Sequence, residues 1–169
     1  YSRLARAFNA NGPADSSAVT RYTLANVPSA PTVAAVSTTS VSVDVNVNSN
    51  PAATQFAIQE TGSSNYVQAN GTLGASAVWQ TDSVWGTITV TGLSVNTQYT
   101  FQVKARNGDN TETAFSTTAA KYTLANNPGN STLTAVSGSS IKVVINLNSN
   151  PACNEFKIPT DWPIVPMID

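Results

Sequence analysis

Between residues 41 and 47 every second position is Val, and the positions between them hold Ser, Asp and Asn. Side chains of a β-strand point alternately to its two faces, so this pattern places the four valines on one side. Residues 99–106 alternate in the same way, with a polar or charged residue after each apolar one. The apolar positions of that segment are Tyr99, Phe101, Val103 and Ala105. Both segments predict half-buried strands, and no window has the apolar period of an amphipathic helix.

Further strands are expected at residues 54–60, 75–81, 84–91 and 116–124, with turn-forming residues between them. In the first of these, Phe56 and Ile58 are predicted to face inward. With the two alternating segments and a first strand before residue 40, the sequence predicts seven short strands. Such a series packs as two sheets face to face, so the expected fold is an all-β sandwich.

Residues 22–58 recur one hundred positions later, at residues 122–158, with 20 of the 37 positions identical and no gap. The second copy keeps an apolar face of Ile141, Val143, Ile145 and Leu147, while the polar face changes: Ser42 becomes Lys142 and Asp44 becomes Val144. Preserved size on one face alone indicates that this face is buried. A period near 100 is typical of a string of independent β-sandwich domains.

Residues 92–107 read GLSVNTQYTFQVKARN and resemble the E–F corner and F strand of a fibronectin type III domain. The resemblance implies a fibronectin type III-like (Ig-like) β-sandwich over residues 28–124. It also implies that Leu93 and Tyr99 form a tyrosine corner, the Tyr99 hydroxyl bonding to the backbone upstream. The Trp that the family usually has in strand B is absent, and Trp85 or Trp79 is expected to fill that volume.

The flanks fit the same scheme, because residues 1–9 align with residues 99–107 and make Tyr1 the corner Tyr of another repeat. One complete domain is therefore expected between two partial repeats. The expected parts are strands F and G of a preceding repeat at 1–25, the complete domain at 28–124, strands A, B and C of a following repeat at 128–158, and an irregular Pro-rich tail at 159–169. With no initiator Met and no signal-like start, the chain is expected to be a piece of a longer tandem array. Alternatively, the two half-domains complement each other from chain to chain and build a filament.

Charged residues make up 10% of the chain, against about 25% in an average soluble domain. The polar surface must then come from Ser, Thr, Asn and Gln, as in secreted and cell-surface β-proteins, and we expect a bacterial protein of that kind. A net charge of −1 gives no field that would attract nucleic acid or an anionic membrane. No apolar run is long enough to insert into a membrane, and a single Cys forms no intrachain disulfide.

Catalytic chemistry has few residues available. The chain has no His, which excludes Ser–His–Asp and Cys–His arrangements, and its nine acidic residues are spread thinly. We therefore expect no enzyme, no cofactor and no metal site.

Two features could support binding. Trp79 and Trp85 could form an aromatic platform for sugar rings, and Lys104 with Arg106 and Lys121 could form a polyanion site. The Arg-Asn-Gly-Asp loop at 106–109 differs from an Arg-Gly-Asp adhesion tripeptide by its Asn, and a tight turn explains it.

The function that these features favour is that of a non-catalytic structural or adhesive module, which spaces or presents other parts of an extracellular or cell-surface protein. Its partners would be protein or glycan surfaces, or further copies of the half-domains. The alternatives are a self-assembling filament subunit and an accessory carbohydrate-binding module of a secreted hydrolase.

Overall fold

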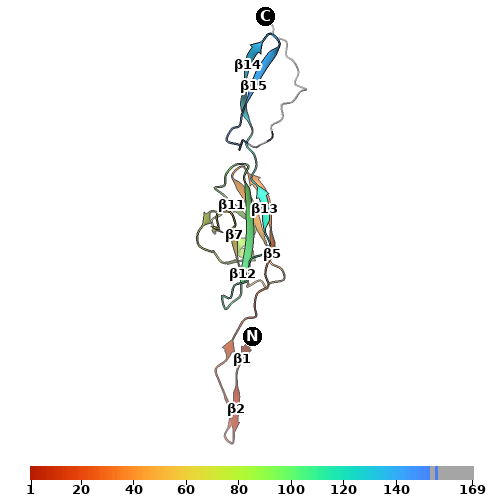
Figure 1. Ribbon diagram of the computed structural model, residues 1–169. Coiled ribbons are helices and arrows are strands. Elements are labelled where there is room, and N and C mark those ends of the chain that lie inside the picture. The colour runs from red at the N-terminus through yellow and green to blue at the C-terminus, as the bar shows by residue number, and fades with distance from the viewer. Residues whose placement is uncertain (153–154, 156–169) are drawn as a thin grey trace. The chain divides into compact units, whose positions relative to one another are not determined.

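The computed structural model describes residues 1–152 and residue 155. The chain divides into two units, Tyr1–Ala125 and Asn126–Asp169 (Figure 1). Most of the third strand expected for the following repeat, the tail at 159–169 and Cys153 lie outside the described residues.

The first unit contains a β-sandwich of two antiparallel sheets. The three-stranded sheet has the order β11 (Ile88–Val90), β6 (Ser40–Asn46) and β5 (Ser29–Ser37). The six-stranded sheet has the order β13 (Ala119–Tyr122), β12 (Gln98–Arg106), β7 (Gln55–Glu60), β8 (Tyr66–Val67) and β9 (Leu73–Gly74), with β10 (Gln80–Thr81) also paired to β7. Figure 1 shows β12 and β13 side by side in this unit.

The strand order identifies the fold. Strands β5, β6 and β11 correspond to A, B and E of one sheet, and β7, β12 and β13 correspond to C, F and G of the other. The central pair, β7 with β12, holds six residue pairs from Phe101 opposite Glu60 to Arg106 opposite Gln55. The first unit therefore has the fibronectin type III-like sandwich that its sequence predicts.

The core lies between the two sheets and contains the predicted inward faces. Val41, Val43 and Val45 of β6 are buried against the apolar side chains of β7 and β12. The remaining buried members of this cluster are Phe56, Ile58, Val67, Trp85, Val90, Leu93, Phe101, Val103 and Ala105. The alternating pattern thus located the buried face of both sheets correctly.

The predicted strands at residues 75–81 and 84–91 are wrong in most of their length. Only Gln80–Thr81 and Ile88–Val90 are strands there, and between them lies a short helix, α1 (Asp82–Trp85). Gly86 ends α1 with a φ of 49°, a conformation that favours Gly, and its N–H donates to the Asp82 carbonyl. This turn directs the Trp85 side chain into the core. A continuous strand through residues 84–91 would contain no such turn.

The last predicted strand is also shorter than expected, since β13 begins at Ala119 rather than near Ser116. Ser116 is held instead by its side chain: its Oγ accepts from the Val103 N–H at 3.0 Å, and its own N–H donates to the Val103 carbonyl at 2.8 Å. The hydrogen bond from the Val103 N–H to the Ser116 hydroxyl thus replaces the backbone–backbone hydrogen bond that a longer β13 would make there.

The N-terminal segment of the first unit forms paired strands. They are β1 (Ser2–Arg3) with β4 (Val19–Thr20), and β2 (Arg6–Asn9) with β3 (Gly12–Asp15). Ser2 lies opposite Thr20, as Thr100 of β12 lies opposite Ala120 of β13. The β1–β4 pair therefore has the same register as the β12–β13 pair at the two aligned positions. The assignment of residues 1–25 to strands F and G stays a prediction.

The second unit is described as a hairpin of β14 (Gly129–Ser137) and β15 (Ser140–Asn146). Its register reproduces the β5–β6 pair of the sandwich residue by residue, including the irregularity after Gly129 that matches the one after Ser29. The corresponding apolar face differs in burial: Val41 is fully buried, whereas Ile141 is 64% exposed.

Candidate functional site

The tyrosine corner is present at Tyr99. Its hydroxyl accepts a hydrogen bond from the Ser94 N–H at 2.8 Å, and Leu93 is buried in the core beside it. This contact fixes the turn into β12, so the role is structural. Tyr1 occupies the same register position in its hairpin, and its side chain is 77% exposed. A corner role for Tyr1 stays a prediction.

Trp85 fills the core volume that the absent strand-B Trp leaves. It is only 4% exposed, and its indole Nε1–H donates to the Phe56 carbonyl at 2.9 Å. Burial satisfies both the apolar ring and its single donor. Trp85 is therefore unable to present a ring to a sugar, and the predicted two-Trp platform is wrong in this respect.

Trp79 lies on the outer face of the six-stranded sheet, under two cations. The Arg106 Cζ lies 4.6 Å from the centroid of the Trp79 ring, and the Lys104 Nζ lies 5.3 Å from it. Lys104 also lies 5.6 Å from the Tyr66 ring and 5.3 Å from the Phe115 ring. Cations at these distances are attracted by the ring faces, so cation–π interactions stabilise the positions of both the aromatic and the basic side chains.

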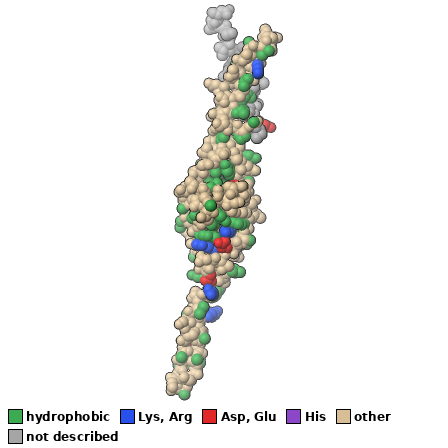
Figure 2. Space-filling model, turned by 60° about the vertical axis from the view of Figure 1, so that its left-hand side comes forward, with side chains coloured by type: hydrophobic (Ala, Val, Ile, Leu, Met, Phe, Trp, Pro, Cys, Tyr) green, Lys and Arg blue, Asp and Glu red, His purple; other side chains and the backbone are tan. Residues whose placement is uncertain are grey.

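Both cations of this cluster are also paired with neighbouring side chains. Lys104 Nζ donates to Glu112 at 2.6 Å, and Arg106 Nε donates to Gln55 at 2.7 Å. Burial lowers the pKa of Lys104, but the hydrogen bond and charge of Glu112, together with Tyr66, outweigh it, so the pKa lies above its ordinary value. Figure 2 shows Lys or Arg and Asp or Glu side chains side by side on this part of the sandwich. The negative charge of Glu112 thus compensates the positive charge of Lys104, and these contacts connect the side chains on this face of the sheet.

The predicted grouping of Lys121 with Lys104 and Arg106 is wrong. Lys121 lies opposite Tyr99 in the β12–β13 ladder, five residues along β12 from Lys104 and on the alternate face. The register therefore places Lys121 on a different face of the sheet from Lys104 and Arg106. The three cations form no cluster, and the polyanion site expected from them is not formed.

A buried carboxylate pins the turn after β7. Glu60 is 4% exposed and accepts from the Gly62 and Ser63 amides and from the Ser63 hydroxyl at 2.7–2.9 Å. Burial raises the pKa of Glu60, but these hydrogen bonds favour its ionised form and hold the pKa below its usual range. The saturated bonding indicates a structural group rather than an acid or base poised for chemistry.

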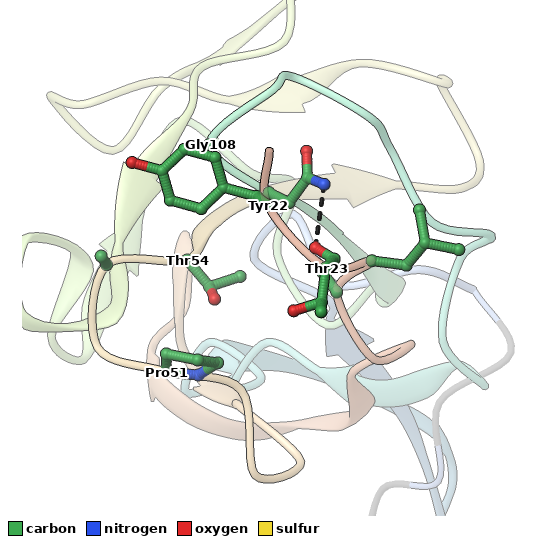
Figure 3. Close-up of a pocket in the computed structure, with 9 residues that line it drawn as sticks. Tyr22, Thr23, Pro51, Thr54 and Gly108 are labelled. Carbon is green, nitrogen blue, oxygen red and sulfur yellow. Dashed lines mark hydrogen bonds between the residues drawn. The ribbon is translucent and has the colours of Figure 1, made fainter. Parts of the chain in front are cut away.

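A pocket of about 300 Å³ lies where the linker at residues 22–25 passes the base of the sandwich (Figure 3). Its other walls are the turn at residues 51–54 and the loop residues Asn107 and Gly108. The Tyr22 ring lies beside Gly108, where a Cβ would come within 2.6 Å of it. Tyr22 N–H donates to the Asp109 carboxylate at 2.9 Å, and Asn107 Nδ2 donates to the Thr23 carbonyl at 2.9 Å. The Arg-Asn-Gly-Asp loop therefore binds the linker of this chain.

The next residues of the linker are fixed by a second set of contacts. Asn50 is buried; its Oδ1 accepts from the Asn26 N–H and its Nδ2 donates to the Asn26 carbonyl, both at 2.8 Å. Asn48 Nδ2 donates to the Val27 carbonyl at 2.8 Å. The amide side chains thus pair with the linker backbone as a neighbouring strand would.

Two further sequence expectations concern metals and membranes. Among residues 1–152 and 155, no group of three or more His, Cys, Asp or Glu side chains could hold a metal ion. Within the same part of the chain, no helix has the length and apolar character needed to cross a membrane.

Comparison with known proteins gives structural neighbours only, since no protein-family model and no curated protein matches the chain. The crystal structure of the FN1–FN3 domains of chicken CNTN1 matches 72% of this chain at 18% identity, with a TM-score of 0.44. This chain covers 41% of that structure.

Two single domains also match. The fibronectin type III domain of human fibronectin type III domain containing protein 3 matches 62% of this chain and 91% of its own length, at 18% identity and a TM-score of 0.43. The FN5 domain of Drosophila Lar matches 60% of this chain and 99% of its own, at 19% identity and a TM-score of 0.38. With scores this low, the fold assignment rests on the strand order and the tyrosine corner of the chain itself.

Proposed function

We propose that the chain is a non-catalytic structural module of a tandem-repeat protein on the surface of, or secreted by, a bacterial cell, where it spaces or presents other parts of that protein. The observation that carries this proposal is structural repetition. The β5–β6 hairpin of the sandwich and the β14–β15 hairpin of the second unit have the same register over all their paired residues.

The repetition extends to individual side chains. Asn126 and Asn150 make the same two hydrogen bonds in the second unit, both at 2.8 Å, that Asn26 and Asn50 make in the first. The preceding turn also recurs in an unusual left-handed backbone conformation, with φ of 49° and 61° at residues 48–49 and of 47° and 64° at residues 148–149. Recurrence of a strained turn supports two copies of one structural unit.

The N-terminal hairpin repeats details of the F–G hairpin in the same way. Ser16 Oγ accepts from the Ala5 N–H at 2.9 Å, as Ser116 does from Val103. The Ser16 N–H also donates to the Ala5 carbonyl at 2.8 Å, as the Ser116 N–H does to the Val103 carbonyl at 2.8 Å. Three successive copies of one repeat, two of them partial, are the simplest account of these equivalences.

Consecutive repeats of a tandem array are joined by short connections, and the linker provides one. Leu124 N–H donates to the Ser37 carbonyl within the first unit, and Asn126 N–H donates to Asn150 within the second. One residue, Ala125, therefore separates the two anchored positions. A connection this short leaves little chain between consecutive repeats, as a tandem array requires.

Intact mass of the natural material tests the proposal. Denaturing mass spectrometry is expected to give a chain far heavier than 17.6 kDa, containing several repeats of this type. A natural chain of about this mass, found as a monomer, would refute a role in a tandem array.

A second candidate function is that of a filament subunit, which the exposed apolar side chains of the terminal segments support. Val19 is 62% exposed in the N-terminal hairpin, and Ile141 and Leu133 are 64% and 66% exposed in the second unit. In the sandwich the equivalent face of β6 is covered by the other sheet. Complementation between copies would cover these faces. Sedimentation at rising concentration separates the two candidates, because only the filament subunit is expected to form long assemblies.

Adhesion to protein or glycan surfaces stays a prediction for this module. The accessory carbohydrate-binding alternative gains no support, because Trp85 is buried and the Trp79 ring is covered by Lys104 and Arg106.

A further inference from the structure

The loop between β12 and β13 contacts the incoming linker with three consecutive residues. Asn107 donates to the Thr23 carbonyl, Gly108 leaves room for the Tyr22 ring, and Asp109 accepts from the Tyr22 N–H. Arg21 adds an ion pair, its Nη1 lying 3.8 Å from the Asp109 carboxylate. Figure 3 shows the Tyr22 ring beside Gly108 and the Asn107–Thr23 hydrogen bond as a dashed line.

These contacts have a different structural role from those at Asn26. The Asn26–Asn50 pair holds the last linker residues against the sandwich that they enter. The loop contacts hold Arg21 and Tyr22, which directly follow β4 of the preceding hairpin, and the Arg21 N–H donates to the Tyr1 carbonyl of that hairpin. Residues 21–22 are therefore bound on one side to the preceding repeat and on the other to the sandwich.

We propose that residues 107–109 form a latch, a surface that binds the linker of the preceding repeat and fixes the direction in which that repeat leaves the sandwich. The inference rests on the proposed function, since it assigns the joint between consecutive repeats. The segment that this latch binds consists of three consecutive residues: a basic residue, Tyr and Thr.

Charge, space and repetition identify the occupant of this surface. The single carboxylate of the loop faces the Arg21 guanidinium and a backbone donor, a combination that favours a basic segment with a free N–H. The absence of a side chain at Gly108 fits an aromatic ring at the adjacent position. The sequence Lys121-Tyr-Thr, which begins within β13, recurs one period after Arg21-Tyr-Thr, so the same ligand sequence stands at the exit of both repeats.

The test uses the whole 169-residue chain and compares it with the double variant Gly108→Ala, Asp109→Ala. The new Cβ displaces the Tyr22 ring, and the second substitution removes the acceptor of the Tyr22 N–H. Gly138→Ala is the matched control, because a Cβ at Gly138 meets nothing within 4 Å. NMR relaxation measures the order of each backbone amide on the nanosecond timescale.

In the unmodified chain and the control, amides of residues 21–23 are expected to be as ordered as those of β12. In the double variant their order should fall to that of a free linker, and exchange of the Tyr22 amide should accelerate roughly tenfold or more, as expected for loss of a hydrogen bond to a charged group. The Asn26 amide should keep its protection, which shows that the sandwich remains folded.

Disorder of residues 21–23 already present in the unmodified chain, or unchanged order in the double variant, would overturn the latch. Either result would leave the spacer proposal standing, with loose joints. Conversely, a natural chain of a single repeat would remove the spacer proposal while the relaxation data still reported whether the loop binds the linker.

Discussion

Replacement of Trp85 by Phe tests whether this residue supplies the core volume of the missing strand-B Trp. Trp85 is 4% exposed and donates one hydrogen bond, to the Phe56 carbonyl. Loss of that bond costs about 1 kcal/mol of unfolding free energy. An aromatic side chain buries ~150–250 Å², so the step to a smaller ring, ~50 Å² at ~25 cal/mol per Å², costs roughly another 1 kcal/mol.

The expected destabilisation is therefore about 2 kcal/mol. Urea unfolding followed by far-UV circular dichroism measures it, and with a slope of ~1–3 kcal/mol per M the midpoint should fall by about 1 M. Trp85→Ala is expected to cost ~3–5 kcal/mol, a large part of the stability of a small domain, so Phe is the more informative change.

Val84→Ala is the matched control, because Val84 is the neighbouring residue of the same short helix and is 64% exposed. It should change the unfolding free energy by less than about 0.5 kcal/mol. If Trp85→Phe costs no more than this control, the indole is not a core residue and the reasoning from its burial and hydrogen bond is refuted.

Three further predictions follow from single contacts. A double-mutant cycle of Lys104→Met and Glu112→Gln is expected to give a coupling of about 0.5–1 kcal/mol, because the Lys104 side chain is only 14% exposed while that of Glu112 is 45% exposed; zero coupling would contradict the ion pair. The lowered pKa of Glu60 means that its ionised form stabilises the fold above the unfolded pKa of about 4.3, and that this contribution is lost as pH falls through the folded pKa. Glu60→Gln should flatten the acid side of the stability–pH curve, and a variant curve parallel to that of the unmodified chain would argue against this role. Tyr99→Phe removes the bond from the Ser94 N–H and should cost about 1 kcal/mol in urea unfolding, whereas an unchanged midpoint would show that the corner contributes nothing.

Alternation along the chain predicted the fold because it records burial directly. Val41, Val43, Phe101 and Val103 face the core as their spacing requires, and all four are fully buried. The repeat added the register of both hairpins, since two segments with the same apolar positions must pair in the same way to bury them.

Helix α1 was not predicted, because four residues are too few to show a helical period. The cluster on the outer sheet face also has no local signature. Lys104 and Arg106 are two residues apart, but the rings that contact them come from Tyr66, Trp79 and Phe115, in three separate segments. Only the paired strands bring those segments together.

The linker contacts could have been found from the sequence. Tyr-Thr-Leu-Ala-Asn at 22–26 and Asn-Ser-Asn-Pro at 48–51 both recur unchanged one hundred residues later. Identity over two separate short segments marks both as constrained, and the Asn26–Asn50 hydrogen bonds supply a shared reason.

The Asn26–Asn50 pair also shifts the point at which one repeat should be separated from the next. A recombinant domain that starts at Pro28 would lack Asn26 and leave the buried Asn50 amide without two of its partners, whereas one that starts at Tyr22 would keep them. The segment that recurs in the sequence begins at this same Tyr. A repeat unit counted from this Tyr contains a sandwich together with the joint that leads into it. Repeats can then be gained or lost without any new interface having to evolve.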